Sequence, residues 1–593
     1  MVPSLPEALS RRARRSRAFV WAFGPHVVLG SYLAFVPDHA LFTATQVAVV
    51  VHVLLALVTL PVLALWFAGH VRAGFGARSV GVPGRPRVTR AARIALTVAA
   101  LAAVATGLRL LPAGDGMPAA AWHRWAGLLA VGPFLAHLAV ERGRAQAMAL
   151  ARLLAAMAVA LTVARLVLPA PTGAPETPAF AVRVRANAGY DPAAWCGECH
   201  TAVYAEWSRS THARSLQIPS VRADFTETQG RVPLRDYDSD LAHARLDQSQ
   251  PCVHCHMPTS FYGDDAAPVL RAPAPTRDGV TCSFCHTLRG VNDARGRPDA
   301  PTRQAFYVSA PETVRRYLGQ GARQPWLRAL GNRLIRWRPE MHRRDYHVPF
   351  LDTANACVGC HGINPATTYA DWERSAYATG DPGTETRCQD CHMARAMTTG
   401  PVREPGRLVP WGPVRPQRRS HFFLGGNVQA PAQLNDRSLA RREHAFAEGA
   451  LRITVAEATL RGARLRVAGR VFNDRIGHSF PGMESSQRLA WVEVRLRDAG
   501  GWVTWASPQP GLDGATPRRD GASPVLYRDP PRPGQDPVDT TVPARGSQGY
   551  ETDLPLPAGF AAPVSVVVVV RNTFDPQPLA QAERAVVRSP SGD

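Results

Sequence analysis

Five copies of the pattern Cys-x-x-Cys-His constrain this chain more than any other feature of its sequence. They begin at Cys196, Cys252, Cys282, Cys357 and Cys388, and together they contain all ten cysteines. Because each pair is followed directly by histidine and no cysteine is left over, disulfide pairing explains the pattern poorly. A zinc site explains one copy better than it explains five. We therefore interpret every copy as the same kind of attachment site.

Cys-x-x-Cys-His is the attachment signature of c-type haem. The two thiols form thioethers to the haem vinyl groups, and the neutral imidazole that follows is a good iron ligand. The sequence thus predicts five covalent haems c. The attachment residues are Cys196, Cys199, Cys252, Cys255, Cys282, Cys285, Cys357, Cys360, Cys388 and Cys391, and the proximal iron ligands are His200, His256, His286, His361 and His392.

The basic character of the chain does not indicate a nucleic-acid partner. The formal charge is +21, and all 68 basic residues are arginine. Many of these arginines flank apolar runs, and haem propionates would offset part of the charge, so we expect no nucleic-acid binding. The absence of lysine also excludes a lysine axial ligand at any haem.

The first 170 residues alternate apolar runs with arginine-rich gaps. The runs cover 18–37, 42–68, 94–112, 122–140 and 147–169. Each is long enough to cross about 30 Å of hydrocarbon. Arginines gather before the first run, after the second and after the fourth, which places those ends inside. We predict a five-helix transmembrane bundle over 1–170 in the bacterial inner membrane, with a cytoplasmic N-terminus. Five crossings leave the remaining chain in the periplasm, where such haems are attached.

Five histidines lie in the apolar runs or within two residues of one, and ionisable groups inside membrane spans are functional candidates. They are His26, His52, His70, His123 and His137. His52 and His70 lie 18 residues apart, which places them on one helix face, and His123 and His137, 14 apart, nearly share another. With alternating helix directions, His52 faces His123 near the outer side and His70 faces His137 near the inner side. Two such pairs predict two haems b, although hydrogen bonding between helices is an alternative.

The stretch "HRWAGLLAVGPFLAH" resembles the fourth helix of the dihaem cytochrome b subunits of formate dehydrogenases and hydrogenases. In that family the inner partner comes from the first helix. The resemblance therefore implies that His26, rather than His70, is the mate of His137, and both alternatives stay open at this point.

A proline-rich linker is predicted over 171–190, followed by a pentahaem cytochrome c domain over 191–445 that is mostly α-helical or irregular. The domain resembles the multihaem cytochromes c that include the tetrahaem cytochromes of nitrifiers and the hydroxylamine-oxidoreductase group. The residues that carry the resemblance are Tyr204, Trp207, Ser210, His212 and Ala213, the "CHM" at two motifs, and "SHFFLGGN" at 420–427.

The resemblance implies that His212 is the distal ligand of a neighbouring haem. Other histidines outside the motifs are His243, His254, His342, His347, His421, His444 and His478, of which we favour His243, His347, His421 and His478 as distal ligands. The stretch "CVGCHGINPATTYADWERSAYA" at 357–378 nearly repeats the first motif region, but Tyr377 replaces the second histidine. Either another segment supplies that ligand, or one haem has an open or tyrosine-bound position.

The C-terminal region changes character. Stretches such as "LRITVAEATL" and "VSVVVVVRN" are rich in β-branched residues and separated by Gly, Pro and Asp. They predict an antiparallel β-sandwich over 446–593. The segment "GHSFP", which contains His478, is similar to segments in β-domains attached to other multihaem cytochromes.

Together these features predict a cytochrome b-like membrane domain fused to a multihaem cytochrome c. Its function would be electron transport between the quinone pool and a periplasmic or extracellular acceptor, which makes it a candidate quinol:acceptor oxidoreductase. One alternative is an enzyme that acts on a small nitrogen or sulfur compound at an open haem. Another is a non-catalytic electron conduit.

The five motifs give a first prediction. In a host that matures cytochromes c, the protein should carry five covalent haems, and replacing Cys282 and Cys285 by serine should remove one of them. Intact-protein mass spectrometry measures both counts. Unmodified cysteine pairs in the wild-type protein would contradict the prediction.

Overall fold

The computed structural model divides into two compact units. The first contains Met1–Pro175, Val314–Tyr346 and Val409–Pro413, and the second contains Glu176–Thr313, His347–Leu408 and Val414–Asp593. The first unit therefore holds two segments from the region predicted as the haem domain. The structure describes residues 5–37, 41–76, 86–113, 116–168, 189–219, 221, 255–259, 274, 276–293, 305–362, 368–381, 383–394, 397, 404–482, 489–510, 512–513, 516–517, 523–526, 528–529, 538–556, 563–573 and 575–589. Most of the predicted linker, 171–190, lies outside these residues.

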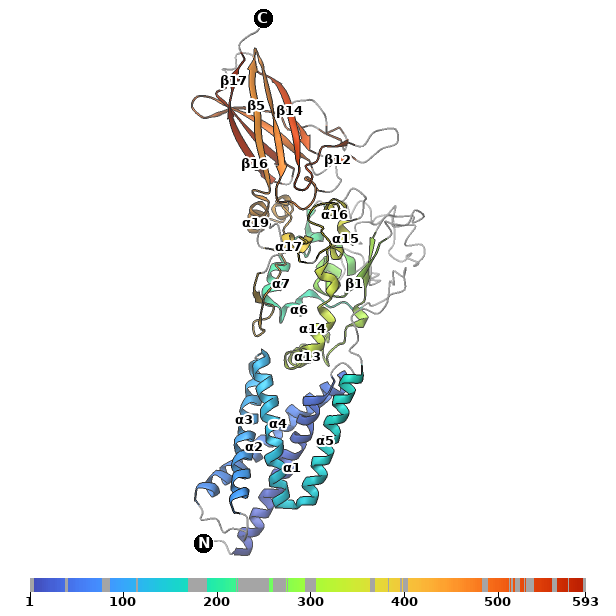
Figure 1. The fold of residues 1–593 in the computed structure, drawn as a ribbon, viewed down its shortest axis with the longest axis vertical. Coiled ribbons are helices and arrows are strands. Elements are labelled where there is room, and N and C mark those ends of the chain that lie inside the picture. Colours follow the sequence, from blue (N-terminus) through green and yellow to red (C-terminus); the bar gives the residue numbers. More distant parts are fainter. Residues whose placement is uncertain are drawn as a thin grey trace. The chain divides into compact units, whose positions relative to one another are not determined.

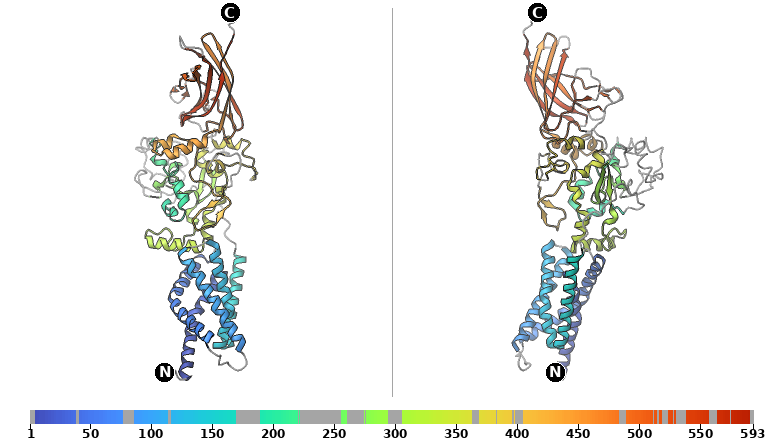
Figure 2. Two further views of the ribbon diagram at one scale, coloured as in Figure 1. Left: turned by 90° about the vertical axis from the view of Figure 1, so that its left-hand side faces the viewer. Right: turned by 45° about the vertical axis from the view of Figure 1, so that its right-hand side comes forward.

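Five long helices form the first part of the chain, and Figures 1 and 2 show them side by side. They are α1 (Leu5–Phe35), α2 (Phe42–Gly76), α3 (Pro86–Ala113), α4 (Gly116–Arg142) and α5 (Arg144–Val167). Several extend beyond the apolar runs of the sequence because arginine and alanine, which flank those runs, are good helix formers. Phe42–Trp66 and Arg144–Val167 are long and apolar enough to cross a membrane. Shorter apolar stretches cover Phe19–Phe35 and Ile94–Leu110, so crossing by all five helices stays a prediction.

Aromatic rings and small residues pack the interior of this bundle. Phe19 of α1 stacks on Trp66 of α2 with ring centres 3.8 Å apart, and Phe134 of α4 lies beside it. Ala100 of α3 and Ala130 of α4 are both buried, which allows these two helices to approach closely.

The segment Val314–Tyr346 also packs in the first unit. It contains α13 (Pro325–Trp337) and α14 (Glu340–Tyr346). Tyr317, Leu334 and Met341 of this segment form a buried cluster with Val49 of α2. These residues lie within the region predicted to hold the haems, and no pattern in the sequence indicated this contact.

The haem-motif region of the second unit consists of short elements joined by irregular chain, which agrees with the lack of sustained periodicity in its sequence. Three motifs lie on helices of their own, α12 (Cys282–Cys285), α15 (Asn355–His361) and α17 (Cys388–His392). The other helices are α6 (Ala193–Gly197), α7 (Thr201–Trp207), η1 (Ser215–Gln217), η4 (Thr276–Asp278), η5 (Pro311–Thr313), η6 (Pro349–Asp352), α16 (Thr368–Glu373), α18 (Gln429–Gln433) and α19 (Arg437–Ala447). Two small hairpins pair β1 (Leu288–Asp293) with β2 (Ala305–Ser309) and β3 (Gly406–Arg407) with β4 (Val414–Arg415).

The C-terminal region forms two larger sheets, which confirms the prediction of strands there. One sheet has the order β14-β6-β5-β17, and the other has the order β11-β7-β15-β16 with β8 beside β7. Apart from the parallel pair β17 and β5, neighbours are antiparallel. The strands are β5 (Leu451–Arg461), β6 (Arg464–Asn473), β7 (Ala490–Arg497), β8 (Val503–Ala506), β11 (Val525–Leu526), β14 (Ser547–Pro555), β15 (Ser565–Asn572), β16 (Asp575–Ala585) and β17 (Val587–Arg588). Short pairs join β9 (Leu512–Asp513) to β10 (Thr516–Pro517) and β12 (Arg528–Asp529) to β13 (Val538–Asp539).

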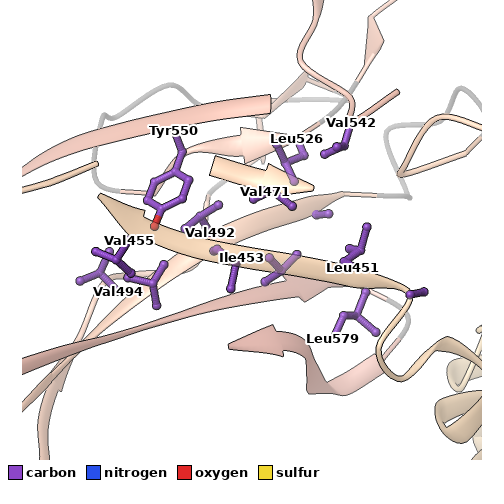
Figure 3. Packing of buried hydrophobic residues seen from close by; sticks show 14 of the residues in the cluster. Leu451, Ile453, Val455, Val471, Val492, Val494, Leu526, Val542, Tyr550 and Leu579 are labelled. Carbon is purple, nitrogen blue, oxygen red and sulfur yellow. The ribbon is translucent and has the colours of Figure 1, made fainter. Parts of the chain in front are cut away.

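Alternating side chains build the core between these two sheets. Buried and exposed positions alternate along β5, as expected for a strand with one face inward. Ile453 and Val471 from one sheet meet Val492 and Val494 from the other in the same cluster (Figure 3). The valine run of β15 is buried on most positions because it lies in the middle of its sheet.

This packing predicts how the region responds to truncation of its core. Leu465 of β6 is 0% exposed, and Leu465→Ala should lower the free energy of opening by about 2–5 kcal/mol. Val587→Ala, at a side chain 59% exposed, should change it by less than about 0.5 kcal/mol. Hydrogen–deuterium exchange of the β5–β6 amides measures both, and equal effects would contradict the assigned core.

Candidate haem sites

The motif cysteines lie close to those of neighbouring motifs. No disulfide joins the described cysteines, and Cys252 lies outside the described residues. A hydrogen bond to Cys282 and burial raise the pKa of Cys196 well above its ordinary value. Burial and the neighbouring Cys360 raise the pKa of Cys285 to about 12. The first motif is thus beside the third, and the third is beside the fourth.

The fourth and fifth motifs form another such pair. A hydrogen bond to the Cys357 thiol, with burial, raises the pKa of Cys388 well above its ordinary value. Four of the five motifs therefore form one continuous series of neighbours, in the order first, third, fourth and fifth. Short distances between adjacent motifs are what a stack of haems in electron-transfer contact requires.

Two motif histidines have one ring nitrogen fixed by the backbone. His200 Nδ1 lies 3.1 Å from the carbonyl oxygen of Leu408, and His392 Nδ1 lies 2.6 Å from that of Leu424. Because a carbonyl oxygen only accepts, Nδ1 carries the proton in both rings. Nε2 is left with its lone pair, which is the arrangement that a metal-binding imidazole needs.

Two of the predicted distal histidines have the same arrangement. His421 Nδ1 lies 3.1 Å from the carbonyl oxygen of Arg419, and His478 Nδ1 lies 2.8 Å from that of Ser479. Their Nε2 atoms are therefore also available as ligands. The backbone N–H of His421 donates to Glu206 of α7 at 3.0 Å. The sequence analysis missed Glu206, although it lies next to Trp207 in the helix that carried the family resemblance.

The structure brings His212 to the histidine of the fourth motif. The ring centres of His212 and His361 are 6.2 Å apart. Imidazole nitrogen binds a first-row metal at about 2 Å, so two imidazoles on opposite sides of one ion have ring centres about 6 Å apart. Burial, with the neighbouring imidazole of His361 next in effect, lowers the pKa of His212 to about 3. The ring is thus neutral at physiological pH, as an iron ligand must be.

The close packing around His212 fixes its position. Val280 N–H donates to the carbonyl oxygen of His212 at 3.0 Å, and Trp207 Nε1 donates to that of Val280 at 2.9 Å. Gly279 has a φ of +67°, and a Cβ there would lie 2.4 Å from the carbonyl oxygen of His212. A side chain at position 279 would clash with this oxygen atom, so only glycine fits there.

The structure also brings His478 to the histidine of the fifth motif. The ring centres of His392 and His478 are 6.4 Å apart and the two rings are nearly parallel, with an interplanar angle of 8°. His478 comes from the turn after β6. Asn473 holds that turn, since its side chain donates to the carbonyl oxygen of His478 at 2.8 Å and accepts from Ile476 N–H at 2.9 Å.

Tyr377, which replaces the second histidine of the near-repeat, packs beneath this turn. Its side chain is 1% exposed, and its hydroxyl group donates to the carbonyl oxygen of Asp474 at 3.5 Å. Arg545 lies over its ring at 4.4 Å, and a Cβ on Gly477 would lie 3.7 Å from it. Tyr377 therefore contacts the turn that carries His478.

His421 lies near two motif histidines. Burial, followed by the neighbouring imidazole of His286, lowers the pKa of His421 to about 3, and His200 contributes in the same direction. His421 is therefore positioned near His286 and His200 at once, and either could be its partner across an iron.

The remaining candidates are less informative. His347 is exposed, His342 lies beside Tyr346 with ring centres 4.9 Å apart, and His444 Nδ1 lies 2.6 Å from Asp575 of β16. His243 and His254 lie outside the described residues. The prediction that His243 and His347 are distal ligands therefore stays a prediction.

In the helix bundle, His52 of α2 and His123 of α4 face each other. Their ring centres are 6.2 Å apart. His123 Nδ1 lies 3.0 Å from the carbonyl oxygen of Ala103, which leaves Nε2 available as a ligand. A Cβ on Gly107 would lie 3.0 Å from the ring of His123, so this glycine makes room for the ring.

His26 lies beside this outer pair rather than at the inner end. Its ring centre is 5.2 Å from that of His52, and its Nε2 lies 2.9 Å from the hydroxyl oxygen of Thr59. Phe19 and Trp66 lie beside His137, at 5.8 and 6.2 Å between ring centres. The side chain of His70 lies outside the described residues. The pairing of His137 with His70 or His26 thus stays a prediction. Phe19 is the residue with which α1 contacts the His137 ring.

Two segments of the chain match models of known families. Residues 195–287 match the family described as cytochrome c554 and c-prime, and residues 343–404 match the N-terminal region of the NapC/NirT cytochrome c family. Among solved structures, the chain is similar to a penta-heme cytochrome c552 from Thermochromatium tepidum. The sequence identity is 16% and the TM-score 0.42, over 67% of this chain and 100% of that chain. No curated protein matches the chain.

The two matched segments contain all five Cys-x-x-Cys-His motifs. The chain is therefore a multihaem cytochrome c with covalently bound c-type haem, as predicted. The count of five, the likeness to the nitrifier and hydroxylamine-oxidoreductase group, and the fusion to a cytochrome b-like domain stay predictions.

The contact between His212 and His361 gives a testable consequence. His212→Ala should leave every covalent haem attached but convert one from low-spin to high-spin, so that it binds cyanide. Electron paramagnetic resonance of the oxidised protein measures the change. Phe423→Leu is the matched control, because Phe423 packs on the His212 ring at 4.5 Å but cannot bind iron. An unchanged low-spin spectrum in His212→Ala would exclude His212 as a ligand.

Proposed function

We propose that this protein is a membrane-anchored cytochrome that carries electrons between the quinone pool and a periplasmic or extracellular acceptor. The carriers would be two haems b in the helix bundle and five haems c outside it. The observation that carries the proposal is the pair His52 and His123, at 6.2 Å inside the bundle of a chain that also bears five haem c motifs. A quinol dissolves in lipid, so its electrons enter most directly at a haem within the membrane.

The residues around His52 and His123 fit a bis-histidine haem. The two rings come from different helices at a spacing that accommodates one iron, about 6 Å between ring centres. Glycines lie against both rings, Gly30 at 3.9 Å from His52 and Gly107 at 3.0 Å from His123, measured from a Cβ placed on each glycine. Glycine at such positions lets a large planar group approach the helix backbone. We assign His52 and His123 as the axial ligands of the outer haem b.

The c-type sites would continue the path. We assign His361 with His212 and His392 with His478 as axial pairs, and we place His421 opposite His286 or His200. Haem iron, when bound, exchanges one electron between its ferric and ferrous states. An iron held by two imidazoles would favour electron transfer over binding of a substrate.

The β-sandwich region would serve as a ligand donor for the fifth motif. The turn after β6 brings the ring centre of His478 to 6.4 Å from that of His392. The hydroxyl group of Tyr377 donates to the carbonyl oxygen of Asp474 in this turn. This arrangement answers the question raised by the near-repeat. Tyrosine stands where a histidine stood in the first copy, and the β region would supply a histidine to the next motif in the chain.

The overall reaction would be oxidation of quinol. Each quinol gives two electrons and two protons and becomes quinone, and the electrons leave one at a time through the haems. With the outer pair near the periplasmic side, the protons would leave on that side. The same path run in reverse would reduce quinone, and the direction depends on the partner potentials.

The alternative of an enzyme with an open haem gains no support from Tyr377. Its side chain is buried under the turn 473–478 and its hydroxyl group is directed at a backbone carbonyl oxygen. A tyrosine in that position is a packing residue rather than an iron ligand.

The haem content tests the proposal. A pyridine haemochrome spectrum of the purified protein should show c-type and b-type haem in the ratio five to two. Five haems of c type alone would remove the quinol path and leave a conduit that the helices merely anchor.

Ligand variants in the bundle test the outer pair. His52→Ala and His123→Ala should each lower the b-type signal by about half while the c-type signal stays constant. His26→Asn is the control, since its ring contacts His52 but bonds to Thr59. Loss of haem b in His26→Asn with retention in His52→Ala would reassign the ligand to His26.

The β region is tested in the same way. His478→Ala should turn one low-spin haem c high-spin without loss of covalent haem. Tyr377→Phe, which removes only the hydroxyl group beneath the turn, should keep every haem low-spin. Identical low-spin spectra for wild type and His478→Ala would exclude the β region as a ligand donor.

A further inference from the structure

Helix α13 is amphipathic in a way that its contacts within the chain explain only in part. Trp326, Leu330, Leu334 and Trp337 follow one another at spacings of three or four residues and therefore lie along one side of the helix. Arginines 328, 333 and 336 occupy other positions around it. The helix thus has an apolar stripe and a basic remainder, the pattern of helices that lie in a membrane surface.

The segment that carries α13 is bonded to the ends of three long helices. Leu318 N–H donates to the side chain of Gln46 near the start of α2 at 2.5 Å. Trp337 Nε1 donates to the carbonyl oxygen of Leu110 in the last turn of α3 at 3.0 Å. Arg338 donates to that of Leu33 in the last turn of α1 at 3.0 Å. These three ends lie on the same side of the bundle, and α13 lies across them (Figure 2).

Within the described part of the chain, other side chains cover one end of the apolar stripe. Leu334 is buried, and Leu330 and Trp337 are partly covered by Leu33, Phe42 and residues of α2 in the same cluster. Trp326, at the other end of the stripe, is 69% exposed. The apolar side therefore continues past the helices that cover it, at the level where those helices end.

We propose that α13 lies in the headgroup layer of the outer leaflet, with Trp326 at the boundary of the hydrocarbon and the exposed Arg333 among lipid phosphates. This inference rests on the proposed crossing of the membrane by the bundle, since the outer helix ends then set the depth of α13. Tryptophan favours that depth because its ring is apolar and its N–H is polar. Arginine binds phosphate oxygens with paired hydrogen bonds, so the charge of the helix complements phospholipid.

In the sequence, α13 lies between the third and fourth haem motifs, so the chain connects it to the haem region at both of its ends. The return segment Val409–Pro413 adds a second tie, since Arg336 of α13 lies 3.8 Å from the ring centre of Trp411.

Hydroxyl-radical footprinting of the full-length protein in phospholipid nanodiscs, one copy per disc, tests the inference. Trp326 and Trp502 of the β region are exposed to similar extents in the protein itself, 69% and 76%. In nanodiscs, Trp326 should be oxidised several-fold more slowly than Trp502, because lipid covers only the first. Equal rates would overturn the inference.

Two further tryptophans separate this inference from the proposed crossing. Trp21 of α1 and Trp122 of α4 are 76% and 69% exposed in the protein and would face lipid. Protection of both with free oxidation of Trp326 would refute the place of α13 while the crossing stands. Free oxidation of all three would refute the crossing itself.

A phospholipid that carries a photoreactive diazirine close to its headgroup shows whether lipid is what covers Trp326. It should label the peptide that contains α13 and not the peptide that contains Trp502. If Trp326 is protected from oxidation but the α13 peptide is not labelled by the lipid, another surface, such as a second copy of the chain, covers the helix. This result would also overturn the inference.

Discussion

An iron held by imidazole on both sides joins two segments of a chain at a fixed distance, and we propose that this constraint organises the whole molecule. Each Cys-x-x-Cys-His motif fixes one imidazole next to its haem, but the second imidazole comes from elsewhere. His212 and His361 are separated by most of the haem region, yet their rings lie 6.2 Å apart. Each proposed pair thus acts as a cross-link, which explains how short helices and irregular chain can hold a defined shape.

In the β region, the same constraint would join a turn of a β-sheet to a helical haem motif. A sheet needs no iron to fold, because alternating valine, leucine and isoleucine side chains fill its interior. The end of strand β6 then positions a turn, which is bonded to the side chains of Asn473 and Tyr377. Tyr377, at the position that corresponds to His212 in the near-repeat, fits this arrangement because it packs against the turn.

Much of this organisation was predictable from the sequence, because its signals are local. The motifs identify covalent haem within five residues each, apolar runs indicate long helices, and β-branched alternation indicates strands. The inference that His52 and His123 share a level followed from helix periodicity, and their rings do meet. His26 was less predictable, because its alignment with His137 depended on how far α1 slides along its neighbours. The position of α1 along the neighbouring helices follows from the packing of Phe19 against Trp66 and Phe134.

Other features of the structure could not be predicted from the sequence, for physical reasons. The partner of a motif histidine depends on contacts between residues far apart in the chain, which spacing does not encode. The return of Val314–Tyr346 to the helix bundle depends on side-chain contacts such as those of Tyr317 and Trp337. The amphipathic pattern of α13 was visible in the sequence, but it occurs equally in helices that pack on a protein core.

We propose a path for electrons from the lipid interior to water, and rapid mixing of the oxidised protein in nanodiscs with a quinol follows electrons along it. The b-type absorbance should change first and the c-type absorbance should follow. Reduction of the c-type haems by dithionite but not by quinol would contradict it.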